Sequence, residues 1–351
     1  MADALATEAA ASPFDADRGP DVRPASQHSR SLVGLRGVPA EELRSLLYAT
    51  GDMLRRIGDP AQRDALRAQL AGRTVATVFF EASTRTRGSF TVAAQRLGAG
   101  VVDLSTGTST GKGETAIDTA LTVEAMGAEA IIVRSGRSGA AHAIDRAVRC
   151  PVINGGDGRH EHPTQGLLDM YALAEAVGRA ETFDLNGVEL VIVGDLANSR
   201  VMRSGIAAAT TLGARITLCG PRAWAPPALR TLGPNVGLVH DLDEALRGHD
   251  DRRLAVMMLR VQHERHGTSA RPFAGLGSAA AYRARFGLTG ERAASLPRGT
   301  VVMHPGPINR HVEIDSVVAD GHVPGITSTV RRQVSIGVAV RMAVLVRAVI
   351  G

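Results

Sequence analysis

The chain has 351 residues, of which 44% are hydrophobic and 21% are charged, so it is long enough for two globular domains. Its net charge of +5 does not indicate a nucleic-acid partner, because the arginines are spread along the whole chain and are not interleaved with aromatic residues. No apolar run reaches the roughly 18 residues that a membrane span needs, and two cysteines are too few for a disulfide framework, which together favour a cytoplasmic protein with no membrane partner.

The first half of the chain has the pattern of an α/β domain. Residues 1–30 contain Asp, Glu, Pro and Arg without an apolar core, which predicts a disordered extension rather than a secretory signal. From Pro39, leucines at helical spacing predict a helix. Up to residue 180, helical patterns then alternate with four apolar runs, as a parallel sheet with crossover helices requires; the runs are RTVATVFF, GVVDLS, AIIVR and PVIN.

The second half repeats this rhythm after a polar boundary, GRAETFDLNG. Its apolar runs are VELVIVGD, RITLCG, NVGLVH, LAVMML and TVVMH. The last segment, residues 327–351, is predicted to form one long apolar helix that completes the first domain. The predicted fold class is therefore α/β, with two doubly wound parallel-sheet domains, residues 31–180 and 181–326, joined by interdomain helices.

A hydroxyl-rich turn follows the first predicted strand, in FFEASTRTRGSF. Ser83, Thr84, Arg85 and Thr86 open a helix there, where backbone N–H groups, hydroxyls and a guanidinium would suit a phosphate. An ordinary helix cap with surface arginines is an equally good interpretation of this segment alone.

A second polar turn, in GGDGRHEHPTQGLLDMY, opens the helix that is predicted from Pro163. His162, Thr164 and Gln165 could hydrogen-bond a small polar substrate from this position. The pair of His160 and His162 could suggest a metal, but no third ligand lies nearby in the sequence, so we expect no metal site.

Six segments in order resemble the catalytic chains of aspartate carbamoyltransferases, in the transcarbamoylase family. The segments read KGET, VEAMGAEAIIVR, GDGRHEHPTQGLLDMY, VGDLANSRVMRS, MLRVQHER and VMHPGPINRHVEI, and the resemblance as a whole covers roughly residues 32–350. The resemblance implies transfer of the carbamoyl group of carbamoyl phosphate to the amine of L-aspartate, in pyrimidine (UMP) synthesis. It also implies that no cofactor, metal or covalent enzyme intermediate is needed.

By the same resemblance, residues 31–180 form the carbamoyl-phosphate-binding domain. Ser83, Thr84, Arg85 and Thr86 would bind phosphate, and Arg134 would bridge phosphate and the carbonyl oxygen. His162 would polarise that oxygen, while Gln165 and the turn of Pro305, Gly306 and Pro307 would bind the carbamoyl nitrogen. The residues implied to be catalytic are Arg85, Thr86, Lys112, Arg134 and His162.

Residues 181–326 would then bind aspartate. Arg200, Arg260 and Gln262 resemble the set that holds the two substrate carboxylates, and a planar guanidinium suits a carboxylate. Aspartate is favoured over ornithine because Glu81 stands where ornithine enzymes commonly have another residue, LRVQ offers a cation and an amide, and HPGP replaces their H-C-L-P.

Lys112 is the only lysine in the chain and lies between two glycines. In the family, the loop that carries Ser109 and Lys112 reaches into a neighbouring subunit's active site, so the resemblance implies a homotrimer with shared sites. A regulatory chain or a dihydroorotase is a further possible partner. Two other functions stay open: a transcarbamoylase with another amine acceptor, and a catalytically silent scaffold for a partner enzyme.

Overall fold

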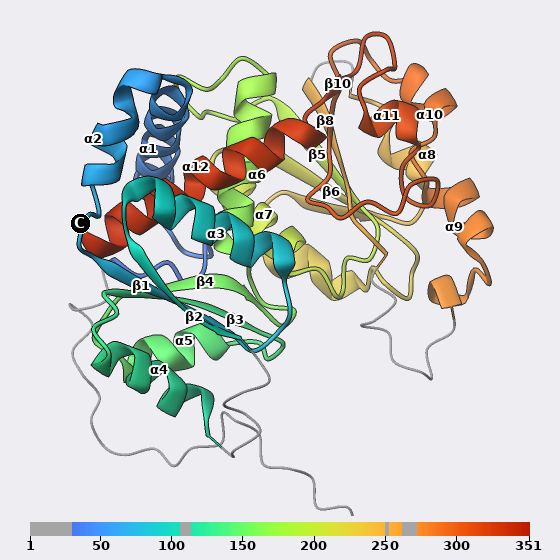
Figure 1. The fold of residues 1–351 in the computed structure, drawn as a ribbon. Helices are drawn as coiled ribbons and strands as arrows, with labels where there is room; N and C mark the ends of the chain where they lie inside the picture. The colour runs from blue at the N-terminus through green and yellow to red at the C-terminus, as the bar shows by residue number, and fades with distance from the viewer. Residues whose placement is uncertain (1–29, 106–113, 250–252, 262–271) are drawn as a thin grey trace, which may run out of the picture.

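The computed structural model describes residues 30–105, 114–249, 253–261 and 272–351. Two separate parallel sheets organise this part of the chain, one in each half of the sequence (Figure 1). The prediction of two doubly wound α/β units is confirmed.

The first sheet has the strand order β2-β1-β3-β4, and all its pairings are parallel. Side chains from its two faces enter different hydrophobic clusters: Val75 and Ile132 face one cluster, and Ala76 and Ile131 face the other. Strands β1 and β3 are therefore buried on both faces, which explains their continuous apolar runs. The strands are β1 (Thr74–Phe79), β2 (Gly100–Ser105), β3 (Ala130–Ser135) and β4 (Val152–Asp157).

Helices cover both faces of this sheet (Figure 1). On one face, α4 (Ala116–Ala125) packs against α5 (Ala140–Ala147). On the other lie α1 (Ala40–Gly58) and α3 (Thr84–Leu97), with α2 (Arg63–Ala68) beside α3. This arrangement leaves the carboxyl ends of the strands open to carry functional turns.

The second sheet has the order β10-β9-β8-β5-β6-β7, again with parallel pairing throughout. Its strands are β5 (Val188–Val193), β6 (Arg215–Cys219), β7 (Val236–Val239), β8 (Arg253–Met258), β9 (Val301–Met303) and β10 (Thr327–Ser328). Its helices are α7 (Arg200–Thr211), α8 (Leu242–Ala245), α9 (Ala279–Phe286), α10 (Gly290–Ala294) and α11 (Ser316–Ala319).

Two long helices connect the halves. Helix α6 (Pro163–Ala176) packs against α7 of the second half and against α1 of the first. The terminal helix α12 (Val330–Val349) lies against α1, α3 and α6, and Figure 1 shows it crossing the molecule toward α1. No helix in the described ranges is both long and apolar enough to cross a membrane.

Candidate active site

The hydroxyl-rich turn lies at the carboxyl end of β1, as predicted. Ser83 is the N-cap of α3, and its Oγ accepts a hydrogen bond from the backbone N–H of Thr86 at 3.4 Å. Thr84, Arg85 and Thr86 form the first turn of the helix, which contains no acidic residue. Free N–H groups and the helix dipole make this turn suitable for an anion.

Arg134 projects from the end of the neighbouring strand β3 and is not a surface arginine, since it is only 9% exposed. Its Nη1 donates to the carbonyl oxygen of Gly155 at 2.9 Å and lies 3.5 Å from Thr86 Oγ1. Its Nη2 contacts Glu81 Oε1 at 2.8 Å. The guanidinium is thereby fixed beside the first turn of α3.

Glu81 joins this arginine to the second half of the molecule. Arg200, the first residue of α7, donates to Glu81 Oε1 at 2.6 Å and to Oε2 at 3.1 Å. One carboxylate therefore holds Arg134, at the end of β3 in the first half, and Arg200, at the start of α7 in the second half. From the sequence, Glu81 served only to distinguish acceptor substrates, and its contact with the two arginines was not predicted. The available signal was the position of Glu81 between β1 and the hydroxyl-rich turn.

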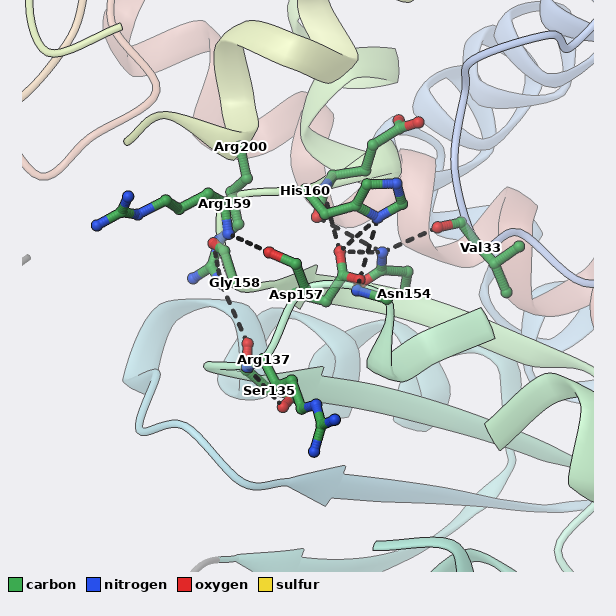
Figure 2. Close-up of polar contacts among 12 residues, drawn as sticks. Val33, Ser135, Arg137, Asn154, Asp157, Gly158, Arg159, His160 and Arg200 are labelled. Atoms are coloured by element: carbon green, nitrogen blue, oxygen red, sulfur yellow. Dashed lines mark hydrogen bonds and ion pairs between the residues drawn. The ribbon is translucent and has the colours of Figure 1, made fainter. Parts of the chain in front are cut away.

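A buried carboxylate shapes the turn after β4 (Figure 2). Asp157 accepts hydrogen bonds from Asn154 Nδ2 at 2.9 Å, from the Gly139 N–H at 2.7 Å and from the Glu161 N–H at 3.0 Å. The ring of His160 lies 3.1 Å from its Oδ2. Burial raises the pKa of Asp157, but these hydrogen bonds outweigh burial and leave the pKa below its ordinary value.

This turn delivers His162 to the N-cap position of α6. The His162 side chain is buried, and its backbone N–H donates to Ser204 Oγ of α7 at 2.9 Å. Burial lowers the pKa of His162 well below 6.5, and the charges of Arg134 and Arg200 lower it further. Within the described part of the chain, its Nδ1 has no hydrogen-bond partner. A neutral imidazole is thus available beside the two arginines.

The pKa values of the two histidines in this turn should be shifted in opposite directions, upward for His160 and downward for His162. The hydrogen bond to Asp157 raises the pKa of His160, which burial opposes. In an NMR pH titration we expect a His160 midpoint above 6.5, whereas the His162 ring should stay neutral down to well below that pH. The stabilisation from His160 is present below its unfolded pKa of about 6.5 and is lost as pH rises through the folded value.

The variant His160→Gln is the control for this titration, because it assigns the signals and should leave His162 unchanged. A His162 midpoint at or above 6.5 would show that the ring is not held neutral by its surroundings.

The turn after β9 reaches the same region. Gly306 has φ +67°, a conformation that favours glycine, and a side-chain carbon there would displace the end of the Arg85 side chain. Burial lowers the pKa of Arg85, and the charge of Arg260 lowers it further, which places these two arginines near each other. Pro305 and Pro307 flank Gly306 in this turn.

Gln165, on the first turn of α6, is held by a buried acid. Its Nε2 donates to Asp169 Oδ1 at 2.9 Å. Burial raises the pKa of Asp169 to about 7, although hydrogen bonds from Gln333 and Gln165 and the charge of Arg341 oppose the rise. Asp169 was not predicted from the sequence.

Three predicted site residues, Ser109, Lys112 and Gln262, lie outside the described residues. Among those that are described, no group of three or more His, Cys, Asp or Glu side chains could hold a metal ion. Of the pair considered for a metal, the His160 ring contacts Asp157, whereas only the backbone N–H of His162 bonds Ser204.

The fold and the site together define a class of protein: a two-domain α/β enzyme whose converging arginines suit anionic substrates. Residues 30–175 match the carbamoyl-phosphate-binding domain of aspartate/ornithine carbamoyltransferases, and residues 186–348 match the Asp/Orn-binding domain. The chain belongs to the aspartate/ornithine carbamoyltransferase family.

Individual relatives agree with this membership. The chain is 45% identical to the aspartate carbamoyltransferase catalytic subunit of Myxococcus xanthus, over 90% of this chain and 98% of the relative. It is 44% identical to the corresponding subunit of Sphingopyxis alaskensis, over 90% of this chain and 86% of the relative. A solved structure of Trypanosoma cruzi aspartate transcarbamoylase with carbamoyl phosphate and aspartate is similar with a TM-score of 0.75 and 27% identity, covering 92% of this chain and 96% of that one.

Proposed function

We propose that this chain transfers the carbamoyl group of carbamoyl phosphate to the amine of L-aspartate, giving N-carbamoyl-L-aspartate and phosphate for pyrimidine synthesis. The observation that carries the proposal is the Arg134–Glu81–Arg200 contact, which brings the carboxyl ends of two sheets together at one site. One substrate carries a phosphate, and the other carries two carboxylates. The site therefore needs cations from more than one structural element.

We assign the binding of carbamoyl phosphate to the domain that contains the first sheet. The first turn of α3, from Ser83 to Thr86, would bind the phosphate, with Arg85 and Arg134 neutralising its charge. His162, neutral and buried, would donate a hydrogen bond to the carbonyl oxygen and meet the negative charge that develops there as the amine attacks. Gln165 and the carbonyl groups around Pro305 and Gly306 would hold the carbamoyl nitrogen.

We assign the binding of aspartate to the domain that contains the second sheet. Arg200 and Arg260 would bind the substrate, with Gln262 as a further ligand. In this proposal the chain divides near residue 180, and the helix within residues 327–351 completes the first domain. Its packing against α1, α3 and α6 supports that division. We place the activity in the cytoplasm, in keeping with the free thiols of Cys150 and Cys219.

The test is formation of ureido product by the purified chain with carbamoyl phosphate and, in parallel, aspartate, ornithine or no acceptor. We expect product with aspartate alone, because the site contributes arginines to the acceptor and would repel the side-chain cation of ornithine. Product with ornithine but not aspartate would identify another acceptor, and no product with either would favour the scaffold function.

We further propose a homotrimer whose sites are shared through Ser109 and Lys112. Chains with Lys112→Ala and chains with Arg85→Ala should each be inactive alone and should regain part of the activity when mixed trimers form, because some hybrid sites take both intact halves. Absence of recovery in trimers shown by mass to be mixed would contradict shared sites.

A further inference from the structure

Two glutamine side chains from distant parts of the chain meet at one buried carboxylate. Asp169, on α6, has no exposed surface. Its Oδ1 accepts a hydrogen bond from Gln165 Nε2 at 2.9 Å and another from Gln333 Nε2, on α12, at 2.7 Å. The acid therefore connects the proposed carbamoyl site with the terminal helix.

An acceptor at this position fixes which way each amide points. A glutamine amide carries a donor and an acceptor on the same carbon, so engaging Nε2 with Asp169 leaves Oε1 facing another direction. In Gln333, that Oε1 accepts a hydrogen bond from the backbone N–H of His304 at 3.0 Å. In Gln165, the bond from Nε2 to Asp169 leaves Oε1 to accept a hydrogen bond from an N–H group of a ligand.

The Gln333 branch reaches the second group proposed for the same nitrogen. The buried ring of His304 accepts at Nδ1 a hydrogen bond from the Gly306 N–H at 2.8 Å. Asp169 thus orients Gln165 directly and the Pro305–Gly306 turn through Gln333 and His304. This contact pattern does not depend on the protonation state of Asp169, because a proton on Oδ2 would leave Oδ1 an acceptor.

We propose that Asp169 is a positioning residue that makes the site select a carbamoyl group over an acyl group of the same shape. This inference rests on the proposed function, since it needs Gln165 to face the carbamoyl nitrogen. Acetyl phosphate has a methyl group where carbamoyl phosphate has NH₂ and cannot donate there. An inverted Gln165 amide would present NH₂ to NH₂ and lose the preference for carbamoyl phosphate.

The test compares the inhibition constant of acetyl phosphate with the KM of carbamoyl phosphate, at saturating aspartate. In Asp169→Leu, the ratio of these constants should fall at least tenfold, because the KM rises while the inhibition constant changes little. Asp169→Asn keeps one acceptor oxygen of the same reach and should restore most of the ratio. The matched control is Glu189→Gln, which should leave the ratio unchanged. Glu189 is a buried acid of β5 that accepts a hydrogen bond from Thr217 Oγ1 at 2.7 Å.

Both constants are independent of the fraction of folded enzyme, so partial instability of a variant does not obscure the result. Asp169→Ala, measured in the same way, replaces Asp169→Leu if leucine prevents folding. An unchanged ratio in the leucine or alanine variant, or an equal fall in the asparagine variant, would overturn the role of Asp169. An inactive wild-type chain would instead contradict the proposed function itself.

Discussion

Replacing Arg134 with methionine should lower kcat/KM for carbamoyl phosphate by roughly a thousandfold, equivalent to about 4 kcal/mol of transition-state stabilisation. Arg134 is buried, fixed by the Gly155 carbonyl and placed beside Thr86, so its charge is held at the proposed phosphate turn. Methionine keeps much of the side-chain volume but supplies neither charge nor donors. Steady-state kinetics with carbamoyl phosphate varied at saturating aspartate measures the loss.

The control is Arg73→Met. Arg73 directly precedes β1 in the same sheet. Its guanidinium is about half exposed and pairs with Glu129 at 2.6 Å, and an exposed ion pair of this kind contributes little. We expect activity within twofold of wild type. A loss below tenfold in an Arg134→Met chain of native thermal stability would remove Arg134 from the catalytic set.

Replacing Glu81 with glutamine should impair the use of aspartate more than that of carbamoyl phosphate. Glutamine keeps the shape but leaves the charges of Arg134 and Arg200 without their shared carboxylate. Arg134 retains a strong bond to Gly155, whereas the other contacts of Arg200 Nη1, to the carbonyl oxygens of Ser135 and Gly158, are longer, at 3.5 and 3.4 Å. Arg200 should therefore lose its position, raising the KM for aspartate at least tenfold and lowering kcat by roughly a hundredfold.

In this variant we expect the KM for carbamoyl phosphate to rise less than threefold. Glu129→Gln is a matched Glu-to-Gln change in an exposed ion pair, and it should alter neither constant. Equal rises for both substrates in Glu81→Gln would show that the carboxylate does not act through Arg200.

The sequence predicted the strands well because most of them are buried on both faces. The runs AIIVR and VELVIVGD lie in β3 and in β5 with its following turn, and both strands are buried throughout. Short elements gave no such signal: β10 has two residues and α8 four, which is about one period of the strand or helix pattern and too short for a repeat to appear. Their structure depends on packing against neighbours distant in sequence.

The same distinction holds at the site. The positions of Arg134 and His162 follow from a strand end and a helix start, which are local features. Glu81 is 119 residues from Arg200, and Asp169 is 164 residues from Gln333, so both contacts depend on how the two halves pack. A single carboxylate with no repeating pattern around it gives no local indication of such a partner.

We infer that the domain of the first sheet binds carbamoyl phosphate and that the domain of the second sheet binds the dicarboxylate. The most direct test is calorimetric titration of a stable phosphonate analogue of carbamoyl phosphate into the wild type, Arg134→Met and Arg200→Met. We expect at least hundredfold weaker binding to Arg134→Met and less than tenfold weaker binding to Arg200→Met. Equal losses in the two variants, or undiminished binding to Arg134→Met, would contradict this division of the site.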